Sequence, residues 1–367
     1  MNPLDRATVT VTQPYVPAYR KPLFDAISRI LYDRGARLQV LAGAPRGTQA
    51  RRGDVTTGDW LQHLPEVAWS IGRREVAVRR LPELPERSIL VSELSPVNTI
   101  AWLRPRSVPF ILWGHGKSYV SDGSPLSDRI KWVLAHRADH VMTYSDGGRD
   151  SLVQRGGISP ERVTAIGNST DTELLRSSLL AVSPSRTLEL RTRYGHGPTA
   201  LFVGGLDASK RIEFLLAAAK YAHDADDRFR LIIVGKGELG ELVRAAAQNQ
   251  FVHWVPEARG ETLAELATVS DAVWMPGRVG LVAVDAMALG LPLHTVSHRY
   301  HAPEIEFLSG RDIAFLPDEP RVFALNSLMR VIQGSRFIRP LEEIPTIGKV
   351  SESFVHVVEE VANARFQ

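Results

Sequence analysis

Residues 199–210 are Thr-Ala-Leu-Phe-Val-Gly-Gly-Leu-Asp-Ala-Ser-Lys, the clearest strand-and-turn pattern in the second half of the chain. A short apolar run ends at Val203, a glycine turn follows, and Lys210 comes soon after the turn. A short apolar run bounded by glycines is consistent with a buried strand of a parallel sheet. Residues 230–237 repeat the pattern with Arg-Leu-Ile-Ile-Val-Gly-Lys-Gly, which predicts a second strand and turn.

The same alternation of strand-like runs and amphipathic helical stretches continues in both directions and is typical of parallel α/β sheets. The second half predicts further strands at residues 251–255, 272–275 and 293–296, with helices between them. The first half predicts strands at residues 8–12, 37–42, 88–91, 110–113 and 140–143. Residues 46–71 are polar and without a clear pattern, so we expect a long excursion there.

The length of 367 residues exceeds the roughly 250–300 residues at which a single hydrophobic core stops growing. We therefore expect an α/β protein with two doubly wound, Rossmann-like domains facing a cleft. The first domain is expected over residues 1–175 and the second over residues 176–340, since Ser, Pro and Gly residues interrupt the pattern between residues 183 and 198. Residues 341–367 are expected to contain a helix that returns to the first domain.

The amino-acid composition limits which kinds of site the protein can contain and which cellular compartment we expect. The chain contains no cysteine, which excludes disulfides, a thiolate nucleophile and cysteine zinc sites. We see no signal peptide and no run of about 18 apolar residues, so we expect a cytoplasmic protein. Residues 1–170 hold 23 Lys and Arg against 16 Asp and Glu, a net charge of +7, whereas the remainder has −4. A basic first half suits an anionic membrane surface or a phosphorylated acceptor, although scattered solvated arginines would give the same count.

An ordered series of motifs resembles retaining family 4 glycosyltransferases of the GT-B fold. The resemblance covers most of residues 8–335. In the second half it rests on Phe202-Val-Gly-Gly-Leu-Asp-Ala-Ser-Lys210, on Ile233-Val-Gly-Lys-Gly-Glu238, on residues 266–276 and on the signature-like stretch from Val279 to Pro292. In the first half it rests on residues 15–24, 140–145 and 166–171. The resemblance implies that the first domain binds the acceptor and the second domain the nucleotide sugar.

The chain departs from the family pattern at three positions. The family signature has two glutamates eight positions apart, where this chain has Gly277 and Asp285. An arginine that normally follows the first glycine is replaced by Gly205. Because a carboxylate at position 277 would accept hydrogen bonds from the donor sugar, we expect a deoxygenated donor sugar or loose selectivity at that place.

The resemblance implies a donor site built from the turns of the second domain. We expect Lys210 to stabilise the diphosphate and therefore to be a catalytic residue. Glycine at Gly280 allows close approach to an anion at a helix start. Asp285 would accept hydrogen bonds from the ribose, and Arg211 could replace the missing arginine. The expected donor-binding residues are Gly204, Gly205, Lys210, Arg211, Val279, Gly280, Leu281 and Asp285. Simpler explanations stay open for three of them: Lys210 as a solvated lysine at a helix start, Gly280 as a glycine needed only for the turn, and Asp285 as a polar residue on a solvated helix face.

In the first domain, His115 follows a strand in the stretch Trp113-Gly-His-Gly-Lys117. Its glycine neighbours allow an exposed backbone, and histidine can bond a sugar hydroxyl or carry a proton near neutrality. We expect His115 to be catalytic, and Lys117 and Asn168 to line the acceptor cleft. Turn chemistry alone would also explain Asn168 and Asp171.

Two metal-like patterns are set aside. Asp224 and Asp226 resemble a metal-binding pair of carboxylates, but they lie in a polar segment away from the carboxyl edge of the sheet. His294, His298 and His301 suggest zinc, but residues 291–296 predict a strand, so the helical spacing of the first two histidines fails. We therefore expect no cofactor and no metal.

The resemblance implies a retaining hexosyl- or deoxyhexosyltransferase that uses a nucleotide sugar and takes part in polysaccharide biosynthesis. The expected acceptor is a glycan, a lipid-linked sugar or a small molecule. We also expect the protein to contact the inner face of an anionic membrane peripherally, and we expect no nucleic-acid partner. Two alternatives remain open: an inactive GT-B-like binding protein, and a sugar-nucleotide epimerase on the same fold.

Overall fold

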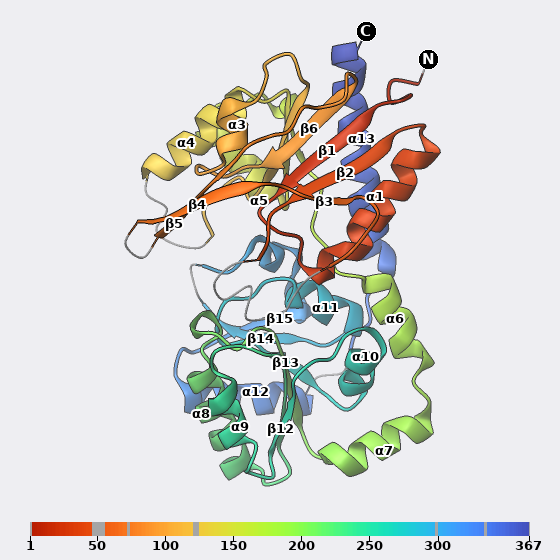
Figure 1. The fold of residues 1–367 in the computed structure, drawn as a ribbon. Helices are drawn as coiled ribbons and strands as arrows, with labels where there is room; N and C mark the ends of the chain where they lie inside the picture. Colours follow the sequence, from red (N-terminus) through yellow and green to blue (C-terminus); the bar gives the residue numbers. More distant parts are fainter. Residues whose placement is uncertain are drawn as a thin grey trace. The chain divides into compact units, whose positions relative to one another are not determined.

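Two parallel sheets, one in each half of the chain, organise the protein (Figure 1). The computed structural model describes residues 2–45, 56–71, 74–119, 125–297, 300–333 and 336–366. Two units result: residues 1–168 together with 347–367, and residues 169–346. The GT-B expectation of two Rossmann-like α/β domains is confirmed.

The first unit contains a seven-stranded parallel sheet in the order β3-β2-β1-β6-β7-β8-β9. Its register aligns Thr8 of β1 with Arg37 of β2 on one side and with Ser88 of β6 on the other. The strands are β1 (Thr8–Gln13), β2 (Arg37–Ala42), β3 (Leu61–His63), β6 (Ser88–Glu93), β7 (Phe110–Gly114), β8 (His140–Thr143) and β9 (Val163–Ala165). The order changes direction between β1 and β6, which is the switch point where such sheets bind ligands.

Helices complete the core of this unit. They are α1 (Lys21–Asp33), α3 (Thr99–Leu103), α4 (Pro125–His136), α5 (Asp146–Asp150) and α13 (Ile347–Phe366). Helix α13 packs beside α1 although the two lie at opposite ends of the sequence (Figure 1). The ring of Trp113 in β7 lies 6.3 Å from that of Phe24 in α1 and 5.4 Å from that of Phe354 in α13. The C-terminal helix therefore belongs to the core of the first unit.

The expectation of a patternless stretch over residues 46–71 is wrong for its second part. Strand β3 extends the sheet at its edge, and β4 (Glu66–Ile71) pairs antiparallel with β5 (Arg74–Arg79). β3 is only three residues long and carries exposed polar side chains, so its sequence lacks the apolar pattern of a buried strand. Residues 46–55 lie outside the described residues.

The second unit contains a six-stranded parallel sheet in the order β12-β11-β10-β13-β14-β15. Its strands are β10 (Thr199–Val203), β11 (Arg230–Val234), β12 (Val252–Val255), β13 (Ala272–Trp274), β14 (Leu293–Val296) and β15 (Ile313–Leu316). Its helices are α6 (Thr172–Ala181), α7 (Pro184–Tyr194), α8 (Ile212–Ala225), α9 (Gly240–Ala246), α10 (Gly260–Thr268), α11 (Val282–Leu289) and α12 (Pro320–Gln333). The last strand and α12 were not among the predicted elements. Helices cover both faces of the sheet (Figure 1).

The expected domain boundary at residues 175/176 falls inside α6. Helix α6 packs against α10 and α11, and the guanidinium of Arg176 donates hydrogen bonds to the carbonyls of Ala288 and Met287 in α11. The whole helix therefore belongs to the second unit. At the other end, the chain leaves this unit at residue 346, six residues after the expected limit of 340.

No helix in the described part of the chain has both the length and the hydropathy that crossing a membrane requires.

Candidate functional site

The predicted donor-binding residues lie at the carboxyl edge of the second sheet. The order of its strands changes direction between β10 and β13, so the loops after these two strands flank the switch point. The first loop runs from Gly204 to Arg211 and includes the short helix Ala208–Lys210. The second loop runs from Met275 to Leu281 and leads into α11. We call them the β10 loop and the β13 loop.

Lys210 connects the two loops. Its Nζ donates a hydrogen bond to the carbonyl of Arg278 at 2.5 Å, and the N–H of Arg278 donates to the carbonyl of Ser209 at 2.8 Å. The stem of Lys210 passes over Gly204, where an added Cβ would lie 3.6 Å from its Cε. The ammonium group is therefore held at the switch point.

Gly277 fills a position where the loops are in close contact. A Cβ added at Gly277 would lie 2.5 Å from the carbonyl carbon of Lys210 and would also collide with the carbonyl oxygen of Ser209. Real Cβ atoms do not approach backbone this closely. Position 277 therefore lacks the open space that a carboxylate facing a sugar would need, and the expectation of a deoxygenated donor loses its geometric basis.

The glycine turn after β11 is also required by close packing. Gly235 has φ +147°, and an added Cβ would collide with the carbonyl oxygen of Gly204. The N–H of Gly204 in turn donates to the carbonyl of Val234 at 3.0 Å. These contacts set the path of the β10 loop beneath Lys210.

The start of α11 offers main-chain donors. The N–H of Val279 donates to Nδ1 of His301 at 3.1 Å, so this group is already used. No hydrogen bond from the N–H of Gly280 or Leu281 occurs in the described part of the chain. Such groups, together with the helix dipole, favour an anion. An added Cβ at Gly280 would meet nothing closer than 3.9 Å, so the surface there is open.

His301 supports the β13 loop, and the sequence analysis did not assign it this role. It is buried, and its Nε2 lies 3.0 Å from the carbonyl of Val296 while Nδ1 accepts from Val279. Since Nδ1 accepts, the ring is a neutral tautomer with its hydrogen on Nε2. His298 lies outside the described residues. Among those that are described, no group of three His, Asp or Glu side chains could hold a metal ion.

Asp285 lies in the first turn of α11 and faces Thr170. The hydroxyl of Thr170 donates to Oδ1 of Asp285 at 2.6 Å, across 115 residues of sequence. Burial raises the pKa of the Asp285 carboxyl to about 6, although the hydrogen bond from Thr170 acts in the opposite direction. This carboxyl group therefore changes its charge close to physiological pH.

Two arginines near the loops differ in their surroundings. Arg211 has φ +54°, pairs with Asp318 at 2.6 Å and lies 4.5 Å from the ring of Phe214, so its charge already has a partner. The Arg278 side chain forms no ion pair with the described residues. Arg278 was not among the predicted residues, because no motif pattern singles it out.

Two of the predicted first-unit residues, His115 and Lys117, follow β7 and lie beside aromatic rings. The ring of His115 lies 5.0 Å from that of Tyr144 and 5.6 Å from that of Tyr119. The ammonium group of Lys117 lies 4.8 Å from the Tyr119 ring. Gly116 has φ +68°, a conformation that favours glycine. Asn168, the other residue predicted for the acceptor site, is buried at 5 % exposure and is the last residue of this unit before the chain enters the second unit.

Arg20 joins this cluster and was missed by the sequence analysis. Its Nη2 donates to the hydroxyl of Tyr144 at 2.8 Å, and its guanidinium lies 4.9 Å from the Trp113 ring. The side chain is 8 % exposed, and the neighbouring tyrosines hold its pKa above the ordinary value despite burial. Glu93, at the end of β6, has a pKa raised by burial. The carboxyl edge of the first sheet thus carries an arginine, a histidine and a carboxyl group.

Comparisons with known proteins agree with this geometry. Residues 197–326 match the family model described as Glycosyl transferases group 1. No curated protein matches the chain significantly in sequence.

Solved structures match nearly the whole chain. HepE from Anabaena, solved with UDP and glucose, is 15% identical, covers 98% of this chain and 99% of its own, and has a TM-score of 0.58. A trehalose 6-phosphate synthase from Burkholderia multivorans is 14% identical, covers 98% of each chain and has a TM-score of 0.63. A UDP-GlcNAc 2-epimerase from Methanocaldococcus jannaschii is 10% identical, covers 97% and 99%, and has a TM-score of 0.57. At these identities the likeness establishes the fold. The chain therefore has the GT-B fold, and residues 197–326 of its second unit are similar to the Glycosyl transferases group 1 model.

Proposed function

We propose that this protein transfers a sugar from a nucleotide-sugar donor to an acceptor, with retention of configuration at the transferred sugar. The observation that carries the proposal is the position of Lys210, which is held at the switch point by the Arg278 carbonyl beside the start of α11. An ammonium group and main-chain N–H donors in one place suit a diphosphate. The group 1 match over the same residues supports this assignment.

Catalysis in this proposal rests on stabilising the leaving group. As the glycosidic bond breaks, negative charge accumulates on the departing diphosphate, and donors placed beforehand lower the barrier. Lys210 and the N–H groups of Gly280 and Leu281 supply those donors. The Arg278 side chain, which has no ion-pair partner in the described part, would provide the positive charge that Gly205 lacks.

Asp285 would bind the donor through its ribose. Its carboxyl group already accepts a hydrogen bond from Thr170 and has oxygen lone pairs left for sugar hydroxyls. Aspartate is one methylene shorter than the glutamate of the family signature, so a water molecule could bridge the remaining gap. In the retaining mechanism that the family resemblance implies, the acceptor hydroxyl enters on the face that the diphosphate leaves.

The acceptor would bind the first unit near His115. The Arg20–Tyr144–His115 cluster combines aromatic surface with cationic groups, which suits a sugar carrying an anionic group. A glycan or a lipid-linked sugar at an anionic membrane meets this description. No metal is part of the proposal, because the donor loops present Lys210 and main-chain N–H groups to the diphosphate.

An epimerase is the second candidate, because the Methanocaldococcus jannaschii UDP-GlcNAc 2-epimerase has a similar fold across the whole chain. The test is a thermal-shift screen over nucleotide diphosphates and nucleotide sugars. A ligand at about 100 times its dissociation constant should add ~2.7 kcal/mol of stability.

The sugar nucleotide that stabilises the protein is then incubated with it, with and without acceptors, and the products are identified by NMR. Transfer only in the presence of acceptor supports the proposal. Conversion of the sugar nucleotide without acceptor would assign an epimerase, and the absence of any stabilising nucleotide would indicate a binding protein of another kind.

A further inference from the structure

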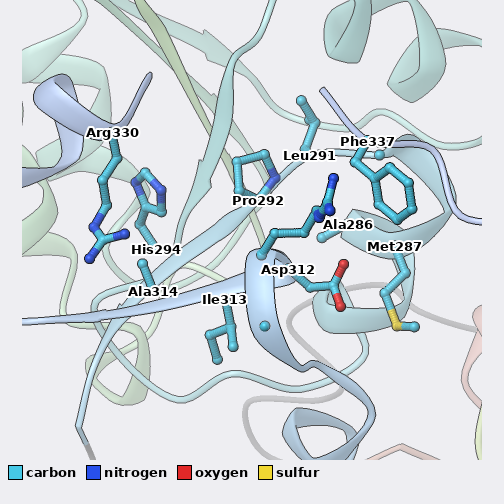
Figure 2. A pocket seen from close by; sticks show the side chains of 13 residues that line it. Ala286, Met287, Leu291, Pro292, His294, Asp312, Ile313, Ala314, Arg330 and Phe337 are labelled. Carbon is cyan, nitrogen blue, oxygen red and sulfur yellow. The ribbon is translucent and has the colours of Figure 1, made fainter. Parts of the chain in front are cut away.

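A cavity of about 400 Å³ lies at the edge of the second sheet that is opposite to the β10 and β13 loops. It is lined by Pro292 and His294 of the β14 segment, by the start of β15, by the C-terminal end of α11 and by Arg330 of α12 (Figure 2). Its volume falls in the range of small-molecule sites, roughly 300–1,000 Å³. Residues of the donor site do not line it, so the cavity is separate from the proposed function.

His294 presents a hydrogen-bond donor to this cavity. Nε1 of Trp274, which can only donate, lies 2.6 Å from the hydroxyl oxygen of Ser327, and that oxygen lies 2.6 Å from Nδ1 of His294. The hydroxyl hydrogen therefore goes to Nδ1, and the ring carries its own hydrogen on Nε2. Burial lowers the pKa of His294 to about 4, so the ring is neutral. The side chain is 2 % exposed, and no hydrogen bond to Nε2 occurs in the described part of the chain.

Two arginines add positive charge at the cavity. Arg330 lies beside His294 (Figure 2), and its charge contributes to the low pKa of that ring. Arg311 lies 4.3 Å from the ring of Phe337. Neither arginine forms an ion pair with the described residues. The carboxylate in the lining, Asp312, is bonded by Arg339, with Nε to Oδ1 at 3.0 Å.

Apolar side chains form the rest of the wall. Met287 comes from the end of α11, Leu291 follows the C-cap of that helix, and Phe337 comes from the segment after α12 (Figure 2). A site with cationic donors on one side and an apolar wall on the other suits an anion attached to a compact apolar body.

We propose that this cavity binds a small organic anion, whose phosphate or carboxylate group is held by Arg330 and the Nε2–H of His294. The apolar body of the ligand packs against Met287, Leu291 and Phe337, and Arg311 adds charge above the Phe337 ring. The cavity shares α11 with the donor site, since Asp285 precedes the lining residues Ala286 and Met287 in that helix.

The test measures binding of phenyl phosphate, benzoate, inorganic phosphate and phenol to the full chain by isothermal titration calorimetry and saturation-transfer NMR. Phenyl phosphate or benzoate should bind more tightly than phenol and than inorganic phosphate, because each of these two ligands fills both the cationic side and the apolar wall of the cavity. The preference between the first two identifies the anionic group. Arg330→Gln should weaken binding at least about tenfold, and Arg311→Gln should weaken it less.

Two controls separate this site from others. Arg321→Gln removes an exposed arginine from the same helix, α12, and should leave binding unchanged. Lys210→Ala should also leave it unchanged, because Lys210 lies at the other edge of the sheet. The proposal is overturned if none of the anions binds more tightly than phenol, if Arg321→Gln weakens binding as much as Arg330→Gln, or if Lys210→Ala abolishes it.

Discussion

The ammonium group of Lys210 donates a hydrogen bond to the main-chain carbonyl of Arg278 at 2.5 Å, and the N–H of Arg278 returns one to the carbonyl of Ser209. The two loops are 68 residues apart in sequence and come from neighbouring strands, β10 and β13. This exchange fixes the position of a positive charge beside the start of α11. It also leaves no space for a side chain at Gly277.

Replacing Lys210 tests whether it contacts a diphosphate. Lys210→Ala should weaken binding of a nucleoside diphosphate roughly 10- to 100-fold and binding of the matching nucleoside little, since a charge-assisted hydrogen bond contributes about 1.5–3 kcal/mol. Titration calorimetry measures both ligands. Lys220→Ala is the control, because Lys220 is exposed on α8 and pairs with Asp224. Equal losses for nucleotide and nucleoside would contradict the assignment.

Substitution of Gly277 should destabilise the protein and should not improve donor binding. Gly277→Ala places a Cβ against the backbone of Ser209 and Lys210, and overpacking of this kind costs about 1–3 kcal/mol. Urea unfolding measures the loss, with Gly280→Ala as the control because its Cβ would meet nothing closer than the Cβ of Ala302 at 3.9 Å.

Gly277→Glu should be at least as destabilising and should lower kcat/KM for hydroxylated and deoxygenated donors together. If Gly277→Glu kept native stability and changed the ratio of kcat/KM between those two donors, the side chain would face the sugar after all.

Because the pKa of the Asp285 carboxyl is raised, the free energy of unfolding should depend on pH. Between about pH 4 and pH 6 the folded carboxyl binds more protons than the unfolded one, so the free energy of unfolding should fall as the pH rises through this window. The contribution is at most about 3 kcal/mol. Asp285→Asn should remove this part of the pH dependence, whereas Asp224→Asn, on an exposed residue, should retain it. Urea titrations at several pH values measure the effect, and identical pH profiles for wild type and Asp285→Asn would show that Asp285 does not titrate there.

Transfer should proceed without a divalent metal. The expected partners of the diphosphate are Lys210 and main-chain N–H groups, which need no bridging cation. Initial rates are measured with the stabilising sugar nucleotide in the presence of EDTA and after addition of manganese or magnesium. Loss of activity in EDTA with recovery on adding the metal would overturn the prediction.

The first unit should bind anionic membranes through exposed arginines. Arg80 is exposed, whereas its neighbour Arg79 pairs with Glu66 at 3.1 Å; Arg51, Arg52 and Arg73 lie outside the described residues. The protein should sediment with vesicles that contain phosphatidylglycerol and not with vesicles of phosphatidylcholine alone. Added salt should weaken binding, since exposed charges are screened beyond ~8 Å at physiological ionic strength. No binding at low salt would reject the membrane interaction and leave only an anionic acceptor in solution.

The α/β class, most strands of both sheets and the positions of the β10 and β13 loops could be predicted from the sequence alone. Buried parallel strands such as Thr199–Val203 and Arg230–Val234 are short apolar runs between glycines, and this pattern is local. Lys210 and the glycines after β10 were predicted from their place after a strand, and the structure has them at the carboxyl edge of the second sheet. Short edge strands such as β3, and β15 with two exposed or partly exposed residues among its four, lack this pattern and were missed.

The contacts between residues that are distant in sequence could be seen only in the folded protein. Thr170 reaches Asp285 across 115 residues, Arg20 reaches Tyr144 across 124, and His301 supports Val279 from another loop. The reason that position 277 is glycine also became visible only when the backbone of Ser209 and Lys210 lay against it. Such contacts depend on how crossover helices bring strand ends together at one edge of a sheet, and periodicity along the chain does not encode that arrangement.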